Sequence, residues 1–230
     1  SLSRLLFPFE TGPSARKLHE KGVESFRGRR YEEAVGYFSR SLRKESNNAK
    51  GLFLLASAWA KQGNFSRALE SLSVLEGRTV DLPRVHARKS YWNLGLGHFD
   101  GAREAARRFV RDSSVPASNR LYGYLVLYTA DLMSGDEEGA RGVLGEARSL
   151  NLPEDSWPAT MLESLVTGNY PSTMNRGERT EFRAWRALLR ATEGRVDDAR
   201  KDRRWVLEEG VQSRYEHDMM LATKASGLLE

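Results

Sequence analysis

Apolar residues recur at intervals of three and four along most of the chain, a spacing that predicts amphipathic α-helices. The pattern is clearest between residues 52 and 75. There Leu52 and Leu55 lie on one face of a first helix, Leu69 and Leu72 lie on one face of a second, and Gly63 separates the two in a turn. The sequence therefore predicts pairs of short helices, each pair with an apolar face to bury.

A short phrase ending in alanine repeats along the chain. Copies end at Ala34, Ala68 and Ala102, so each alanine follows the previous one by 34 residues. Less regular copies end at Ala140 and Ala199. A period of this length in a helical sequence indicates stacked helix-turn-helix units. We interpret the five alanines as structural repeat positions, where a small side chain lets two helix backbones approach to ~8–10 Å.

The repeat resembles that of the tetratricopeptide repeat (TPR) family, whose units are antiparallel helix pairs. The second repeat carries the resemblance most completely, and similar residues recur in the first repeat and more loosely in the third. The resemblance implies an all-α fold, a right-handed superhelical solenoid of antiparallel helix pairs with a C-terminal capping helix. The matching residues of the second repeat are Leu52, Leu55, Ala56, Trp59, Gly63, Phe65 and Ala68.

The regularity of the repeat changes along the chain and predicts four regions. Residues 1–13 are expected to form an N-terminal extension that contains the apolar segment Phe7-Pro8-Phe9. Residues 14–150 match four TPR units, and the pattern then decays into a degenerate repeat over residues 151–178. Residues 179–230 are predicted to form one more TPR-like unit followed by the capping helix.

In this family a concave groove is lined mainly by the first helix of each unit, and partners bind there. Projected onto this chain, those positions carry basic and aromatic side chains, which suit a peptide or helix with acidic residues. The alternative is that they are ordinary solvated residues of a scaffold that binds elsewhere. The implied residues of the partner-binding groove are Arg16, His19, Lys50, Phe53, Ser57, Lys61, Arg84, Arg88, Tyr91 and Tyr122.

Some members of the family hold the C-terminal carboxylate of a chaperone with basic and amide side chains. Arg84 and Arg88 match the last pair of that set and lie one helical turn apart. At the other positions this chain has His19, Val23 and Leu54, so the set is incomplete. We therefore do not expect the chain to bind chaperone tails.

The chain has a formal charge of +5 at pH 7, and arginine carries most of its positive charge. Arginines recur at helical spacing over residues 103–111 and again over residues 179–190. Each stripe is either the solvated side of a helix or a contact for an anionic ligand. Nucleic acid is not the partner that this modest charge favours. The absence of cysteine excludes disulfides and cysteine-ligated metals.

No set of residues has the spacing of a catalytic or metal site. The four histidines are scattered, and none belongs to an HExxH arrangement. We therefore expect no enzyme activity, no cofactor and no metal. No apolar stretch approaches the ~20 residues of a membrane span. The chain is expected to be soluble, in the cytoplasm or, if a leader was removed, in the periplasm.

The sequence favours a non-enzymatic scaffold or adaptor for protein–protein interaction, which binds a peptide or helix of a partner in its concave groove. Two alternatives stay open. The chain could be a structural subunit of a larger assembly, such as one of the cell envelope, or it could bind an anionic ligand or nucleic acid through its arginine-rich faces. The oligomeric state is not indicated by the sequence.

Overall fold

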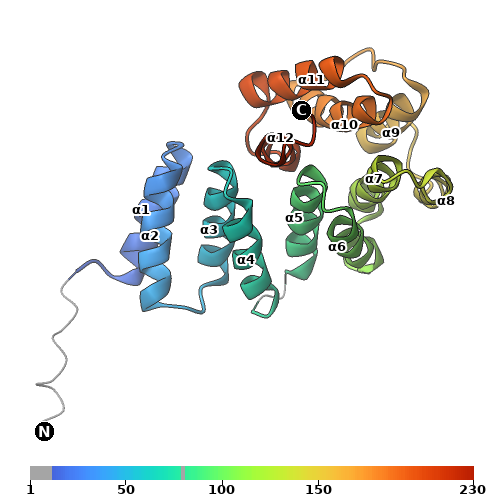
Figure 1. Cartoon of the computed structure of the whole chain (residues 1–230). Helices are drawn as coiled ribbons and strands as arrows, with labels where there is room; N and C mark the ends of the chain where they lie inside the picture. Colours follow the sequence, from blue (N-terminus) through green and yellow to red (C-terminus); the bar gives the residue numbers. More distant parts are fainter. Residues whose placement is uncertain (1–11, 79–80) are drawn as a thin grey trace, which may run out of the picture. The chain divides into compact units, whose positions relative to one another are not determined.

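The computed structural model describes residues 12–78 and 81–230, so the predicted apolar segment Phe7-Pro8-Phe9 lies outside the described residues. Within those ranges the chain has twelve α-helices and no strand (Figure 1). This confirms an all-α helical repeat fold, while the handedness of the superhelix stays a prediction. The chain divides into two compact units, residues 1–79 and 80–230.

Most of the helices form pairs that are joined by a short turn. The first unit contains two such pairs, α1 (Ala15–Arg27) with α2 (Tyr31–Lys44), and α3 (Ala49–Lys61) with α4 (Phe65–Glu76). The pairs of the second unit are α5 (Leu82–Gly95) with α6 (Phe99–Arg111), α7 (Ala117–Met133) with α8 (Glu137–Arg148), and α10 (Arg176–Thr192) with α11 (Val196–Glu209). The remaining helices are α9 (Trp157–Thr167) and α12 (Tyr215–Ser226).

The turns inside the pairs share one backbone conformation. Gly63, Gly97, Gly135 and Gly194 have φ angles of 79°, 75°, 83° and 75°, in the left-handed region. The turn between α1 and α2 has Arg29 at the equivalent position, with a φ of 59°. Glycine adopts this conformation without the steric cost that a side chain brings. The residue five positions before each repeat alanine therefore sets the turn, and the alanine lies in the helix that follows.

The alanines that end the phrase lie in the interior. Ala34, Ala68, Ala102 and Ala199 have no exposed surface, and Ala140 is 1% exposed. Small buried side chains at these positions let the two helices of a pair approach closely. A larger residue there would overpack the pair.

Helix α12 lies at the position of the predicted C-terminal cap. It packs against α10 and α11 and also along α5 (Figure 1). Gly95 allows this approach, because a Cβ atom there would lie 2.4 Å from the carbonyl oxygen of Met219 and 2.7 Å from the Cβ of Ala222. The Ser226 hydroxyl donates to the Gly95 carbonyl oxygen at 3.0 Å. A face of α5 is thus covered by the chain itself.

Candidate functional site

Two of the predicted groove residues lie on α1 in the first unit. Arg16 is exposed and forms an ion pair with Glu20 at 3.0 Å. The ring of His19 lies 5.6 Å from that of Phe38, centroid to centroid. Burial and then the positive charge of Lys50 lower the pKa of His19 below its usual 6.5. His19 is therefore neutral at pH 7 and offers a partner no positive charge.

Four more predicted groove residues lie on α3. Lys50 is exposed, and Phe53 and Lys61 are half-buried. Ser57 is buried, and its hydroxyl donates to the backbone carbonyl oxygen of Phe53 at 3.0 Å. This side chain bonds within its own helix, and a contact of Ser57 with a partner stays a prediction.

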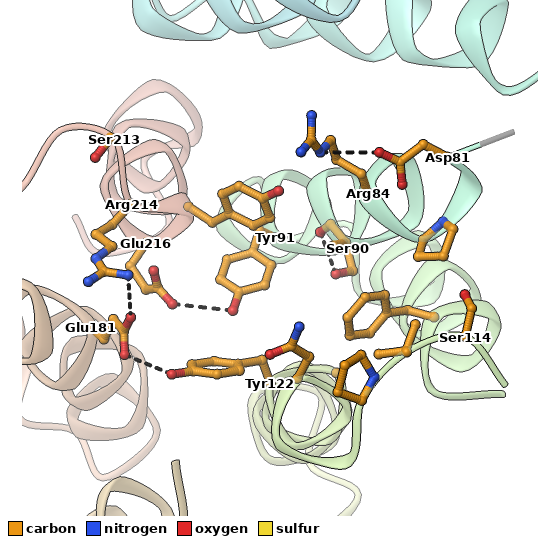
Figure 2. A pocket seen from close by; sticks show the side chains of 18 residues that line it. Asp81, Arg84, Ser90, Tyr91, Ser114, Tyr122, Glu181, Ser213, Arg214 and Glu216 are labelled. Atoms are coloured by element: carbon orange, nitrogen blue, oxygen red, sulfur yellow. Dashed lines mark hydrogen bonds and ion pairs between the residues drawn. The ribbon is translucent and has the colours of Figure 1, made fainter. Parts of the chain in front are cut away.

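The remaining four residues lie in the second unit, and three of them line one pocket. Arg84 and Tyr91 on α5 and Tyr122 on α7 lie around a cavity of about 580 Å³ (Figure 2). The loop between α6 and α7, helix α10 and the start of α12 supply the rest of the wall. A cavity of this size lies within the range of ligand-binding sites. We take it as the candidate site.

One wall of the pocket is formed around the carboxylate of Glu181, which is 6% exposed. Its Oε2 accepts hydrogen bonds from the Tyr122 hydroxyl at 2.9 Å and from Trp157 Nε1 at 2.6 Å. Its Oε1 lies 3.3 Å from a guanidinium nitrogen of Arg214 (Figure 2). These partners hold the carboxylate in place in a largely buried position.

A second carboxyl group, that of Glu216 in the first turn of α12, is 3% exposed. It accepts a hydrogen bond from the Tyr91 hydroxyl at 3.2 Å. The Tyr91 ring is held edge-on against Trp185 and Tyr215, with centroids 5.3 and 5.5 Å away. Burial and then the negative charge of Glu181 raise the pKa of Glu216 to about 8, so it keeps its proton at pH 7. Burial also raises the pKa of Tyr91.

Sequence reasoning missed both carboxyl groups. A glutamate in an amphipathic helix is usually on the solvated face, and nothing in the residue type says otherwise. The signal in the sequence is the apolar residues that follow each glutamate. Glu181 precedes Phe182, and Glu216 stands shortly before Met219, both on helices with strongly apolar inner positions.

The paired arginines of the predicted groove separate in the structure. Arg84 is exposed at the edge of the pocket and lies 3.4 Å from Asp81. Arg88 instead donates to Asp218 of α12 at 3.2 Å, with its guanidinium carbon 4.2 Å from the centroid of the Tyr215 ring. Helix α12 covers that side of α5, and a contact of Arg88 with a partner stays a prediction.

The two arginine stripes also hold the fold together. Arg186 donates to both oxygens of Asp202, at 2.8 and 2.7 Å, and Arg190 donates to the same carboxylate at 2.8 Å. These bonds join α10 to α11. In the other stripe Arg103 donates to Asp131 at 2.7 Å, which joins α6 to α7. An anionic ligand would have to compete with these carboxylates for the same arginines.

Replacing Asp202 with asparagine is expected to lower the free energy of unfolding by about 2–3 kcal/mol, because it removes the charge that three arginines share. Arg186 and Arg190 stay about one-fifth exposed, which limits the loss. Asp198→Asn is the control, since it breaks an exposed pair with Arg195 and should leave stability nearly unchanged. Urea denaturation measures both, and an equal loss in the two variants would contradict the structural role of Asp202.

No group of three or more histidine, aspartate or glutamate side chains within residues 12–78 and 81–230 is arranged to bind a metal ion. None of the helices in that part of the chain combines the length and the apolar character that crossing a membrane requires. The pocket wall itself contains neither histidine nor lysine.

Comparison with known proteins supports the repeat architecture. A family model described as tetratricopeptide repeat matches residues 20–79. The fold is similar to that of PilW, described as a widely conserved type IV pilus biogenesis factor, with a TM-score of 0.53, 14% identity and coverage of 91% of this chain and 97% of PilW. It is also similar to the TPR domain of P58(IPK), with a TM-score of 0.49, 14% identity and coverage of 94% of this chain and 65% of the other. No curated protein sequence matches the chain.

Proposed function

We propose that this chain, whose residues 20–79 match the tetratricopeptide repeat model, is a non-enzymatic scaffold that binds a segment of a partner protein in the pocket of its second unit. Proteins of this fold typically mediate protein–protein interactions. Their stacked helix pairs form a preformed surface, which binds without the entropic cost of ordering the binding site itself.

The observation that carries this proposal is the convergence of three predicted residues on one cavity. Arg84, Tyr91 and Tyr122 occupy first-helix positions that the resemblance assigns to the groove, and all three line the same pocket of about 580 Å³. The pocket is open to solvent and is lined by aromatic, charged and polar residues, as partner-binding sites are. The tyrosines bring large contact area with few rotatable bonds.

An acidic partner was expected from the basic residues of the groove. In the structure Arg84 lies near Asp81 and Arg88 bonds to Asp218, so both basic side chains already have carboxylate neighbours. The proposal therefore does not depend on an acidic partner.

Blocking the pocket is expected to weaken peptide binding. Asn119 is an exposed residue of the pocket wall, and Asn119→Trp would place a large side chain in the cavity. Peptides selected from a random displayed library on the intact chain should bind this variant about tenfold more weakly or worse. Ser73→Trp, at an exposed position of α4, is the matched control and should bind like the wild type. Equal affinity of all three proteins in a calorimetric titration would reject the pocket as the binding site.

A structural role in a larger assembly is the second candidate. What supports it is that the fold resembles PilW, a pilus biogenesis factor, over 97% of the length of that protein. Light scattering distinguishes the two candidates. A stable oligomer of the intact chain at micromolar concentration favours the assembly role, and a monomer favours the scaffold that binds a separate partner.

A further inference from the structure

The pocket wall contains more carboxyl groups than arginines, three against two. Arg214 lies 3.3 Å from Glu181. Arg84 lies 3.4 Å from Asp81. Each arginine thus has a carboxylate of the same wall within ion-pair distance. The third carboxyl group, that of Glu216, has no such arginine of its own in the wall.

Glu216 lies where a lone negative charge is costly. It is 3% exposed, and the side-chain donor that it meets is the neutral Tyr91 hydroxyl, at 3.2 Å. Burial and the charge of Glu181 raise the pKa of Glu216 to about 8, so in the free pocket a proton neutralises it at pH 7. A cation beside Glu216 would stabilise the carboxylate and take the place of that proton.

The rest of the wall suits a cation as well. The aromatic rings of Tyr91, Phe109, Tyr122 and Tyr215 all line the pocket, and the faces of such rings attract positive charge. The chain already makes one contact of this kind, since the guanidinium of Arg88 lies 4.2 Å from the centroid of the Tyr215 ring. An anion would be less favoured, because both arginines of the wall already have carboxylate neighbours.

We propose that the pocket binds the guanidinium or ammonium group of an arginine or lysine side chain on an extended segment of a partner, with the Glu216 carboxylate as counter-charge. The inference rests on the proposed function and specifies the chemistry of the partner. The net charge of +5 opposes a basic partner at long range. Physiological salt screens that repulsion beyond about 8 Å, so the local carboxyl groups decide the outcome at contact.

The test changes the peptide before it changes the protein. Peptides selected on the intact chain should share an arginine or lysine at a fixed position. Replacing that residue with citrulline, which keeps the shape of arginine but not its charge, should weaken binding to the wild type about tenfold or more. On Glu216→Gln the arginine peptide should bind more weakly, and the difference between arginine and citrulline should shrink to less than about threefold.

Glu104→Gln is the matched control, because it removes an exposed carboxylate that pairs with Arg108 outside the pocket. This variant should keep the full difference between arginine and citrulline. Selected peptides without a fixed basic residue, or equal binding of arginine and citrulline by the wild type, would overturn the inference. Agmatine is a small molecule that carries the same guanidinium group. If it bound as tightly as the whole peptide, the occupant of the pocket would not be a segment of a partner. Failure of the proposed function is a separate outcome, in which Asn119→Trp weakens no selected peptide.

Discussion

Replacing Gly95 with leucine is expected to lower the free energy of unfolding of the second unit by about 3 kcal/mol or more and to detach α12 from α5. A Cβ atom at this position would lie 2.4 Å from the Met219 carbonyl oxygen and 2.7 Å from the Ala222 Cβ. The first of these neighbours belongs to the backbone and cannot rotate away. One of the two helices must therefore move, and the hydrogen bond from Ser226 to Gly95 is lost with it.

The matched control is Gly142→Leu, also inside a helix. A Cβ atom at Gly142 meets no atom within 4 Å, so leucine should raise stability slightly through its helix propensity, by about 0.5–1 kcal/mol. Chemical denaturation gives the two free energies, and limited proteolysis reports whether the segment before α12 becomes accessible. If both leucines are tolerated equally, the close packing of α12 on α5 is wrong.

The stability of the chain is expected to fall as the pH rises from 5 to 9, because of Glu216. Its pKa is about 8 in the folded chain against an ordinary value of 4.5, so between these values the folded state binds a proton that the unfolded state has released. Stability that depends on this proton is complete below pH 4.5 and is lost as the pH passes through 8. The full difference is on the order of 5 kcal/mol.

Glu216→Gln isolates this contribution from every other titrating group. Glutamine has no proton to lose, and its oxygen can still accept the hydrogen bond from the Tyr91 hydroxyl. The variant should therefore gain stability relative to the wild type as the pH rises, with the largest gain above pH 8. Urea denaturation of both proteins at pH 5 and pH 9 measures the gain. A difference between variant and wild type that stays constant with pH would contradict the buried, proton-binding carboxyl group.

The helix pairs could be predicted because their signals are local. The apolar spacing, the turn position and the alanine all fall within 34 residues, as between Ala34 and Ala68. The packing of α12 on α5 could not be predicted in this way. It joins residues such as Arg88 and Asp218, which are 130 positions apart, and no periodic pattern connects them.

One trace of that packing was nevertheless present in the sequence. Lys89 and Asn93 interrupt the apolar stripe expected for the first helix of the third repeat. The structure gives the reason, because α5 is buried on several sides by α6, α7 and α12, so its apolar residues are not confined to one face.

The candidate site, like the fold, can be predicted from the sequence only in part. Tyr91 and Tyr122 stand at groove positions that the family resemblance implies. Glu181 and Glu216 lie on α10 and α12, and only the folding of the chain brings these helices to the pocket.

The contact between α5 and α12 has a consequence for the order of events during synthesis. An open array of repeats can fold pair by pair as it emerges from the ribosome, because each pair needs only its neighbour. In the second unit the hydrogen bond between Gly95 and Ser226 spans 131 positions. Closing so long a loop is entropically costly and slows folding. The α1–α4 pairs can therefore form cotranslationally, while the pocket is completed only after α12 has left the exit tunnel.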